Sequence, residues 1–185
     1  MIYDHTTGYA IWENLLGGSR QITATEEQYN TIKLARNRLS HLRDVEEKFL
    51  LICESYSDFE RYLFDVKISD MLFSISDLTS FNDSINSINR KILHFLTCTK
   101  LYLDTIESHY EKISQQKNAK LMKEIKSHTY DNSIDYFIMD NLRNYVQHAY
   151  LPINSTEFVS CWDKDRKKLL YNSQYKIELA QLDKS

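Results

Sequence analysis

The sequence predicts an all-α fold, namely an up-and-down helical bundle with two long antiparallel helices. The chain of 185 residues contains only three glycines and one proline, and neither residue type occurs between Gly18 and Pro152. Because glycine and proline are the residues that most often interrupt helices, such a stretch favours long helices. Apolar side chains recur along it at the three- and four-residue spacing of amphipathic helices. The chain is long enough for one domain with a substantial core.

The N-terminal segment differs in composition from the rest of the chain. Residues 1–22 hold all three glycines, so we expect a short irregular arm, with one helical turn at most, that packs Ile11, Trp12 and Leu15 on the body. Thr25 is followed by Glu26 and Glu27, and acidic residues in a first turn favour the start of a helix.

Two long helices are predicted next. In the first, apolar pairs alternate at three- and four-residue spacing over four heptads, and the pairs are Leu42/Val45, Phe49/Ile52, Tyr56/Phe59 and Leu63/Val66. An extended coiled coil would show the same pattern, but other amphipathic segments in the chain are available to cover this helix as a bundle. A break rich in Ser, Asp and Asn at 74–84 precedes a second long helix over 82–114 and a shorter helix over 117–128.

A final helix is predicted before the only proline. Residues 128–133 form a turn in which Asp131 or Asn132 is the expected N-cap. The helix must end by Leu151, since the residue before a proline disfavours helical geometry. We assign 1–152 to the bundle with its N-terminal arm, and 153–185 to a small C-terminal extension that is either a hairpin or a loose helix.

Composition limits the function. The formal net charge is −3, so nucleic-acid binding needs a local basic patch rather than a field over the whole protein. The three cysteines are far apart in the sequence, which is typical of reduced thiols in the cytoplasm. There is no run of 18 apolar residues and no signal-peptide pattern, so we expect a soluble cytoplasmic protein that does not engage a membrane.

No cofactor or metal is expected from the motifs. The chain has no glycine-rich phosphate loop, no H-E-x-x-H and no serine nucleophile elbow. None of the six histidines is paired with another at the i, i+4 spacing of a helical metal site. The prediction is therefore a protein without metal or organic cofactor.

An Arg-Asn-x-x-x-His pattern occurs twice. The first copy runs from Arg36 to His41, inside the first long helix, and we interpret it as a solvated flank. The second copy comprises Arg143, Asn144 and His148 and lies at a helix end beside a proline and among aromatic residues. Side chains at such an end can converge on a cleft.

The second copy has the groups needed to cleave RNA without a metal. A guanidinium binds a phosphate through forked donors, and an imidazole transfers protons near neutral pH. Five residues of separation place Arg143 and His148 about 140° apart around a regular helix. They would converge if the helix distorts or if a second subunit completes the site. The alternative is that both residues cap the last carbonyls of the helix and favour its negative dipole end.

Other polar residues have two interpretations. Lys117, Lys120, Lys123 and Lys126 form a row that is either a solvated face or a phosphate-binding patch. Asn89 and Arg90 interrupt an apolar run in the second long helix. They form either a buried polar pair near the cleft or part of the surface.

The second copy resembles the signature of the HEPN superfamily of prokaryotic ribonucleases, Arg-x(4–6)-His with a polar residue after the arginine. Arg143, Asn144 and His148 match it position by position. With Tyr150, the string also resembles the Arg-x4-His-x-Tyr form of HepT-type toxins, in which a tyrosine two places after the arginine accepts AMP. Tyr145 stands at that place.

The resemblance implies a helical bundle that dimerises about its motif helices, so that two Arg/His sets form one cleft for metal-independent RNA cleavage. Arg143 would bind the scissile phosphate, His148 would be the general acid and base, and Asn144 would orient one of them. Tyr145 and Tyr150 would line the cleft or stack on a base. The setting would be a toxin–antitoxin or phage-defence system, with a nucleotidyltransferase-like antitoxin protein as partner. The alternative function is a non-catalytic helical module that dimerises or holds a partner protein.

Overall fold

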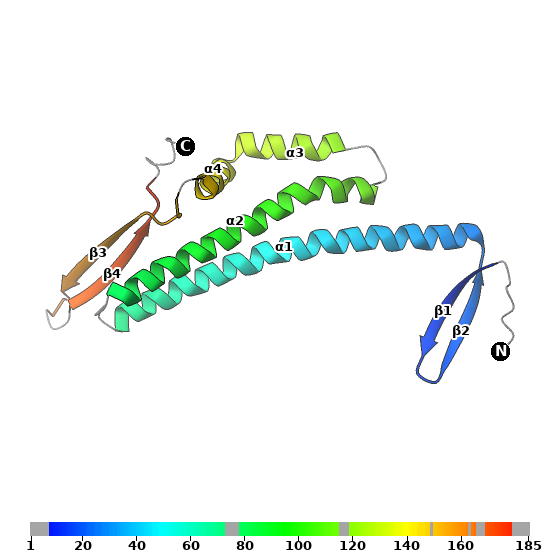
Figure 1. The fold of residues 1–185 in the computed structure, drawn as a ribbon, viewed down its shortest axis with the longest axis horizontal. Coiled ribbons are helices and arrows are strands. Elements are labelled where there is room, and N and C mark those ends of the chain that lie inside the picture. The colour runs from blue at the N-terminus through cyan, green and yellow to red at the C-terminus, as the bar shows by residue number, and fades with distance from the viewer. Residues whose placement is uncertain are drawn as a thin grey trace.

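The computed structural model describes residues 8–72, 78–114, 119–148, 150–162, 164–165 and 169–178. The elements in chain order are β1 (Tyr9–Leu15), β2 (Gly18–Ala24), α1 (Glu26–Leu72), α2 (Leu78–Ser114), α3 (Ala119–Asn132), α4 (Ile134–His148), β3 (Ser155–Trp162) and β4 (Leu169–Lys176). Figure 1 shows an elongated molecule in which α1 and α2 run side by side and α3 and α4 lie on the side of α2 away from α1. The predicted helical bundle with two long helices is confirmed.

The two long helices are antiparallel. Phe49 of α1 contacts Tyr102 of α2, with ring centroids 6.1 Å apart, and Tyr56 of α1 contacts Phe95 of α2 at 5.7 Å. The residue numbers rise along α1 while those of their partners on α2 fall. The end of α2 reaches the turn of α1 that contains Asp44, which faces His109. The first turns of α1 therefore project beyond α2, and residues 26–33 are all exposed.

The apolar stripe of α1 is only partly covered. The second member of each predicted pair is buried or half-buried, and these members are Val45, Ile52, Phe59 and Val66. The first members remain half exposed over most of the helix, with Leu42 at 48%, Phe49 at 51% and Tyr56 at 49%. One neighbouring helix covers one side of the stripe, so an apolar surface is left along α1.

The core lies where α4 packs on α2. Ile88, Ile92 and Leu96 of α2 pack with Leu142 of α4, and all four are buried. The half-buried residues around this cluster come from α1, α4 and the C-terminal segment, and they are Phe59, Tyr62, Leu63, Met139, Val146, Ile153, Tyr175 and Ile177. The core therefore fixes α4 against α2.

Side chains cap two helices. At the start of α1, Gln28 N–H donates to Thr25 Oγ1 (3.2 Å) and Thr25 N–H donates to Gln28 Oε1 (2.9 Å), a reciprocal capping box. The start predicted at Thr25 is confirmed. For α4 the predicted N-cap was wrong: Ser133 Oγ, rather than Asp131 or Asn132, accepts the Tyr136 N–H at 3.2 Å.

The boundaries of the middle helices differ from those predicted by a few residues. Helix α2 begins at Leu78, inside the predicted break, and α3 extends to Asn132, past its predicted end at 128. Serine and asparagine in these stretches made both ends look like loops, but neither residue type excludes a helix when neighbouring apolar residues have packing partners.

The N-terminal arm is more regular than predicted. Strands β1 and β2 form an antiparallel hairpin, and Gly17 in its turn has a φ of 99°, which glycine adopts without strain. Tyr9 stacks on Tyr29 of α1 with centroids 4.6 Å apart. Trp12 is 60% exposed, so its predicted packing on the body was wrong.

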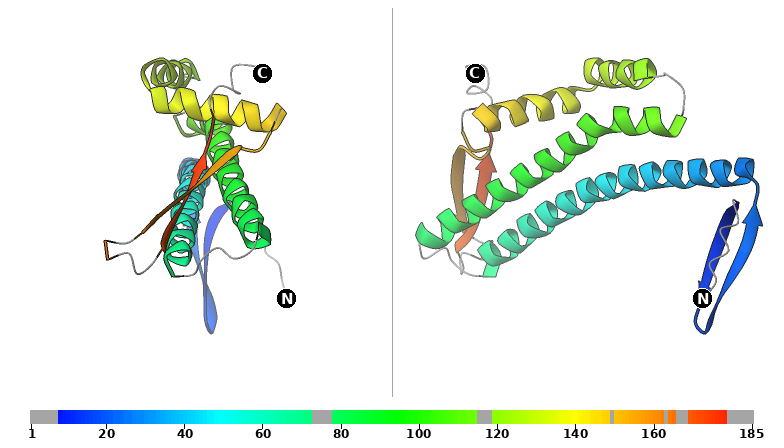
Figure 2. Two further views of the ribbon diagram at one scale, coloured as in Figure 1. Left: turned by 90° about the vertical axis from the view of Figure 1, so that its left-hand side faces the viewer. Right: turned by 45° about the vertical axis from the view of Figure 1, so that its right-hand side comes forward.

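The C-terminal segment forms a hairpin, one of the two structures expected for it. Strands β3 and β4 pair antiparallel, and Figure 2 shows the hairpin beside the end of α1 and α2 that is remote from β1 and β2. Lys67 Nζ of α1 donates to the carbonyl of Ser173. Burial, together with the nearby charge of Asp70, raises the pKa of Tyr175 to about 12. The hairpin thus packs on the bundle.

Among the described residues, no helix combines the length and the apolar character needed to cross a membrane.

Candidate functional site at the end of helix α4

The end of α4 is fixed by buried residues. Leu142 is 5% exposed and Tyr145 1% exposed, and Pro152 after the helix is also buried. Asn89 Oδ1 on α2 accepts the Ile153 N–H at 2.8 Å, and Asn89 is itself 2% exposed. The helix end and the chain after it are therefore held against α2 by apolar packing and by one buried hydrogen bond.

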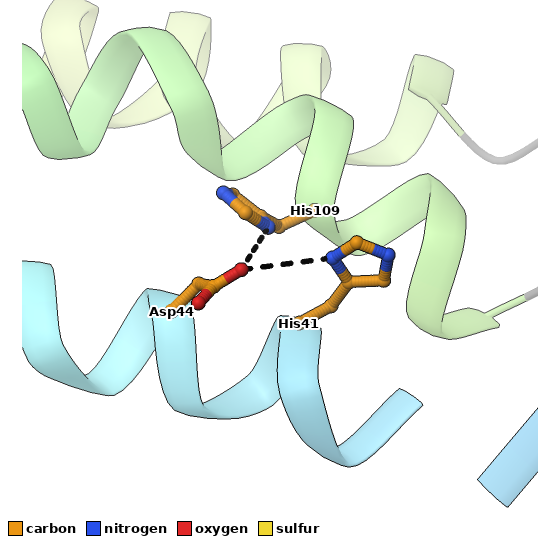
Figure 3. Close-up of side chains that lie close together, drawn as sticks. All are labelled: His41, Asp44 and His109. Atoms are coloured by element: carbon orange, nitrogen blue, oxygen red, sulfur yellow. Dashed lines mark ion pairs between the residues drawn. The ribbon is translucent and has the colours of Figure 1, made fainter. Parts of the chain in front are cut away.

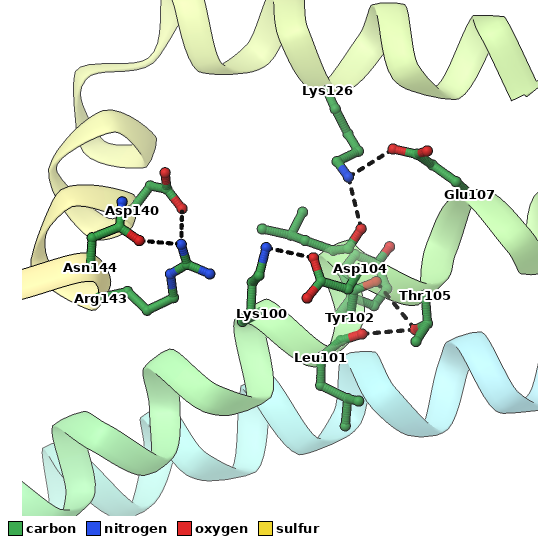
Figure 4. Close-up of polar contacts among 11 residues, drawn as sticks. Lys100, Leu101, Tyr102, Asp104, Thr105, Glu107, Lys126, Asp140, Arg143 and Asn144 are labelled. Carbon is green, nitrogen blue, oxygen red and sulfur yellow. Dashed lines mark hydrogen bonds and ion pairs between the residues drawn. The ribbon is translucent and has the colours of Figure 1, made fainter. Parts of the chain in front are cut away.

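Arg143 lies on the side of α4 that faces α2. Its Nη2 is 3.4 Å from Asp140 Oδ1 and donates to Asn144 Oδ1, as Figure 4 shows. The arginine side chain is 16% exposed, and its Nε is buried without a hydrogen-bond partner. The described contacts of the guanidinium are with side chains rather than with the last carbonyls of the helix, so they differ from the predicted cap.

A narrow groove runs beside Arg143. Its volume is about 20 Å³, room for about one water molecule, and its lining includes Lys100 and Asp140. Lys100 forms an ion pair of 2.6 Å with Asp104. The two cationic side chains in this region are thus balanced by carboxylates, and a phosphate would have to displace Asp140 from Arg143 to reach the guanidinium.

His148 lies in the last turn of α4 and is exposed. It does not line the groove beside Arg143. Within one chain, the structure therefore does not bring the two residues of the motif to one pocket, in keeping with the angle of about 140° between them around the helix axis. A cationic imidazole in a last turn also favours the helix dipole, so the capping role of His148 remains compatible with its position.

The two tyrosines of the motif have different environments. Tyr145 is 1% exposed, whereas Tyr150 is 70% exposed, and their ring centroids are 6.2 Å apart. Tyr150 is accessible to a base or to a partner. Tyr145 contributes to packing, and its hydroxyl is not presented on the surface for modification.

Three of the four lysines in the predicted phosphate-binding row lie on α3. Lys120 and Lys123 are exposed, and Lys120 forms a surface ion pair of 3.5 Å with Glu124. Lys117 lies outside the described residues. Lys126 instead joins α3 to α2, because its Nζ is 2.8 Å from Glu107 Oε1 and 2.9 Å from the carbonyl of Leu103 (Figure 4).

The first copy of the motif is only in part the solvated flank that we expected. Arg36 and Asn37 are exposed, but the side chain of His41 is 27% exposed and faces α2. There it meets His109, whose ring centroid is 5.5 Å away. These two histidines were not predicted to lie together because they belong to different helices. The signal that could have linked them was the antiparallel alignment of the two long apolar stripes.

Comparisons with known proteins do not add a family: no family model matches the sequence, and neither curated proteins nor solved structures show a significant similarity to it.

Proposed function

We propose that the protein is an endoribonuclease that cleaves RNA without a catalytic metal, as a homodimer in which the ends of two α4 helices form one site. The observation that supports the proposal is the way in which the fold holds the helix that carries the motif. Buried Tyr145 and the Asn89–Ile153 hydrogen bond anchor the helix end on α2, while His148 in its last turn is exposed. Catalytic groups work best on such a supported element.

The geometry of α4 and the chemistry of RNA cleavage together give a reason for a second protein chain. In RNA cleavage the 2′-oxygen loses a proton and attacks phosphorus, and the 5′-oxygen leaves and takes up a proton. Arg143 and His148 of one chain are about 140° apart around α4, so the arginine of one chain would serve the histidine of the other. That His148 would take the proton from the 2′-oxygen as a base and then return it, as an acid, to the 5′-oxygen. Arg143 would stabilise the charge on the phosphorane once the incoming phosphate replaces Asp140 as its partner.

Asn144 has a defined part in this scheme. Its Oδ1 accepts a hydrogen bond from Arg143, so it orients the guanidinium rather than the imidazole. Tyr150 would stack on a base beside the scissile bond, and Lys120 and Lys123 would contact flanking phosphates. The burial of Tyr145 argues against a role as an AMP acceptor, so we do not extend the proposal to that modification.

The setting that we propose is cytoplasmic, in a toxin–antitoxin or phage-defence system, with the nucleotidyltransferase-like antitoxin as a further partner. These assignments rest on the resemblance of Arg143, Asn144 and His148 to the HEPN signature.

The direct test is the cleavage of transfer RNA by the purified protein in excess EDTA. We expect His148→Ala to lower the rate about 100-fold or more, as loss of a general acid–base group does. Arg143→Ala should lower it about 100-fold through loss of charge stabilisation. His128→Ala, which changes an exposed histidine of α3, is the matched control and should cleave like the parent. Undiminished cleavage by His148→Ala would end the catalytic assignment.

A second candidate function is supported by the surface of the chain. At 22.0 kDa the protein exposes 14380 Å², whereas a compact monomer of this mass exposes about 9,300 Å². Such an excess is typical of chains that bury further surface in an assembly. A non-catalytic dimerisation or partner-binding module would account for it without any reaction. The parent protein then forms a stable assembly but cleaves no RNA, and the His148→Ala protein behaves identically.

A further inference from the structure

A separate cluster of polar side chains lies between α1 and α2. His41 and Asp44 are one turn apart on α1, and His109 comes from α2 to meet them; Figure 3 shows the three side chains pointing toward one another. Asp44 Oδ2 is 3.8 Å from His41 Nδ1 and 4.0 Å from His109 Nδ1. One ligand atom of each residue lies within 4.8 Å of the other two. No residue of this cluster belongs to α4.

The two ring nitrogens are the feature that needs an explanation. Nδ1 of His41 and Nδ1 of His109 are both buried, and neither has a hydrogen-bond partner. Both are directed at the same carboxylate oxygen, but at distances too long for a hydrogen bond. Buried polar atoms are normally satisfied, so two unsatisfied atoms facing one oxygen indicate that a group fits between them.

We propose that His41, Asp44 and His109 bind one Zn²⁺ ion, which links α1 to α2. Two imidazoles and one carboxylate form a typical borderline donor set for zinc and for the neighbouring first-row divalent ions. In tetrahedral zinc sites, bonds of about 2.0–2.2 Å place donor atoms about 3.4 Å apart. The two separations from Asp44 therefore need to shorten by about half an ångström. The separation between the two histidine ligand atoms, which is at most 4.8 Å, needs to shorten by up to about 1.4 Å, so both rings must rotate toward the ion.

The environment of His109 suits a metal ligand. Burial, followed by the nearby charge of Lys48, lowers the pKa of His109, although Asp44 opposes this. The shift favours the neutral ring, which is the form of histidine that coordinates a metal, and so it agrees with the geometry of the cluster. The site would use three protein ligands and leave a fourth tetrahedral position for water, on the side where Asp44 is 38% exposed.

Lys48 competes with the zinc ion for the ring of His109. Its Nζ lies 3.1 Å from His109 Nε2, and an ammonium can only donate a hydrogen bond. The proton of the neutral ring then resides on Nδ1. For Nδ1 to bind zinc, that proton must move to Nε2, and Lys48 must turn away toward solvent. Replacing Lys48 by methionine should therefore strengthen zinc binding severalfold, because the competing hydrogen bond and the positive charge are both removed.

The test is the titration of the untagged full-length protein, first stripped with a chelator, with Zn²⁺ by calorimetry and with Co²⁺ by visible absorption. We expect one ion per chain, Co²⁺ bands that zinc abolishes, and a rise in the unfolding temperature as Zn²⁺ is added. His41→Ala and Asp44→Asn should each weaken binding at least tenfold. His128→Ala, an exposed histidine on α3, should bind as the parent does.

Several outcomes would overturn the proposal. They are the absence of saturable binding by the parent, unchanged affinity in His41→Ala, or an equal loss in His128→Ala. His41 is more exposed than His109, so replacing His41 disturbs the fold less than replacing His109 would. Circular dichroism checks that the His41→Ala protein keeps its helical structure. Unchanged or weaker binding by Lys48→Met would contradict the competition. Since the readouts are binding and unfolding rather than RNA cleavage, the result does not depend on the proposed enzyme.

Discussion

Asn89 connects the core of α2 to the chain that follows the motif helix. Its Oδ1 accepts the Ile153 N–H at 2.8 Å, and Asn89 is 2% exposed, so water replaces the bond poorly when it is removed. Asn89→Ala should lower the free energy of unfolding by about 1–3 kcal/mol, the cost of a partly buried N–H that loses its partner. Urea denaturation measures this change.

Asn86 provides the matched control for that substitution. It lies on the same helix but is exposed, so Asn86→Ala should change the stability by no more than about 0.5 kcal/mol. Equal losses in the two variants would show that the Asn89–Ile153 bond does not fix the end of α4.

The lowered pKa of His109 predicts a pH dependence of stability. Above its ordinary value of 6.5 the ring is neutral in the folded and unfolded states alike. As the pH falls below 6.5, the unfolded chain takes up a proton that the folded chain does not, so the free energy of unfolding decreases. In the His109→Gln protein, the free energy of unfolding should therefore fall less between about pH 7.5 and about pH 5.5 than it does in the parent. Denaturation midpoints measured in EDTA at the two pH values test this.

The groups around His109 define the control for this prediction. His41, Asp44 and Lys48 of α1 and Lys112 of α2 all contribute to its pKa, so these residues are left intact. His128→Gln, at an exposed site, should keep the full pH dependence of the parent. A His109→Gln protein with the same pH dependence as the parent would contradict the assignment.

At the scale of elements, the first turns of α1 should be the least protected part of that helix. Residues 26–33 are exposed and project beyond the end of α2, whereas Ile88, Ile92 and Leu96 are buried in the core. An unsupported helical end opens at little cost in free energy. We expect its backbone amides to exchange with deuterium at least about a hundredfold faster than those of the core segment of α2.

Hydrogen exchange followed by mass spectrometry or NMR measures the two segments in one experiment. Residues 26–33 of α1 and the segment of α2 that contains Ile88, Ile92 and Leu96 are compared within the same sample, so the core serves as an internal reference. Exchange as slow in 26–33 as in the core would mean that another surface covers this end of α1.

The long helices and the hairpins differ in how far sequence predicts them. Periodicity over four heptads is a strong local signal, and the stripe along α1 follows it. The N-terminal hairpin was missed because its strands are short and mixed in composition, with a turn marked only by Gly17 and Gly18. Such a hairpin gains its regularity from cross-strand pairing, which periodicity within one strand does not reveal.

The candidate site, too, could be predicted from the sequence only in part. The position of Arg143 and His148 on one helix, and the end of that helix before Pro152, follow from the sequence. The contacts of Arg143 with Asp140 and Asn144, and the burial of Tyr145, depend on how α4 packs on α2. That packing joins residues far apart in the chain, as it also does for His41 and His109, and no local pattern encodes it.

At the scale of the whole molecule, the exposed area predicts association. The chain exposes 14380 Å², roughly half as much again as the about 9,300 Å² of a compact monomer of its mass. Obligate dimers bury about 2,000–5,000 Å² in total, or about 1,000–2,500 Å² per chain, so one symmetric partner would cover up to about half of the excess. Light scattering after size exclusion should give twice the mass of 22.0 kDa at micromolar concentration. A monomer mass under these conditions would contradict the dimer.

The central claim is that Arg143 and His148 of two copies form one RNA-cleaving site. Its most direct test mixes two inactive proteins, Arg143→Ala and His148→Ala, after denaturation and joint refolding. If the arginine of one copy serves the histidine of the other, half of the dimers are mixed and each carries one intact pair, so about a quarter of the parent activity should return. Activity that stays at the level of either variant alone, in dimers shown to be mixed, would contradict the account.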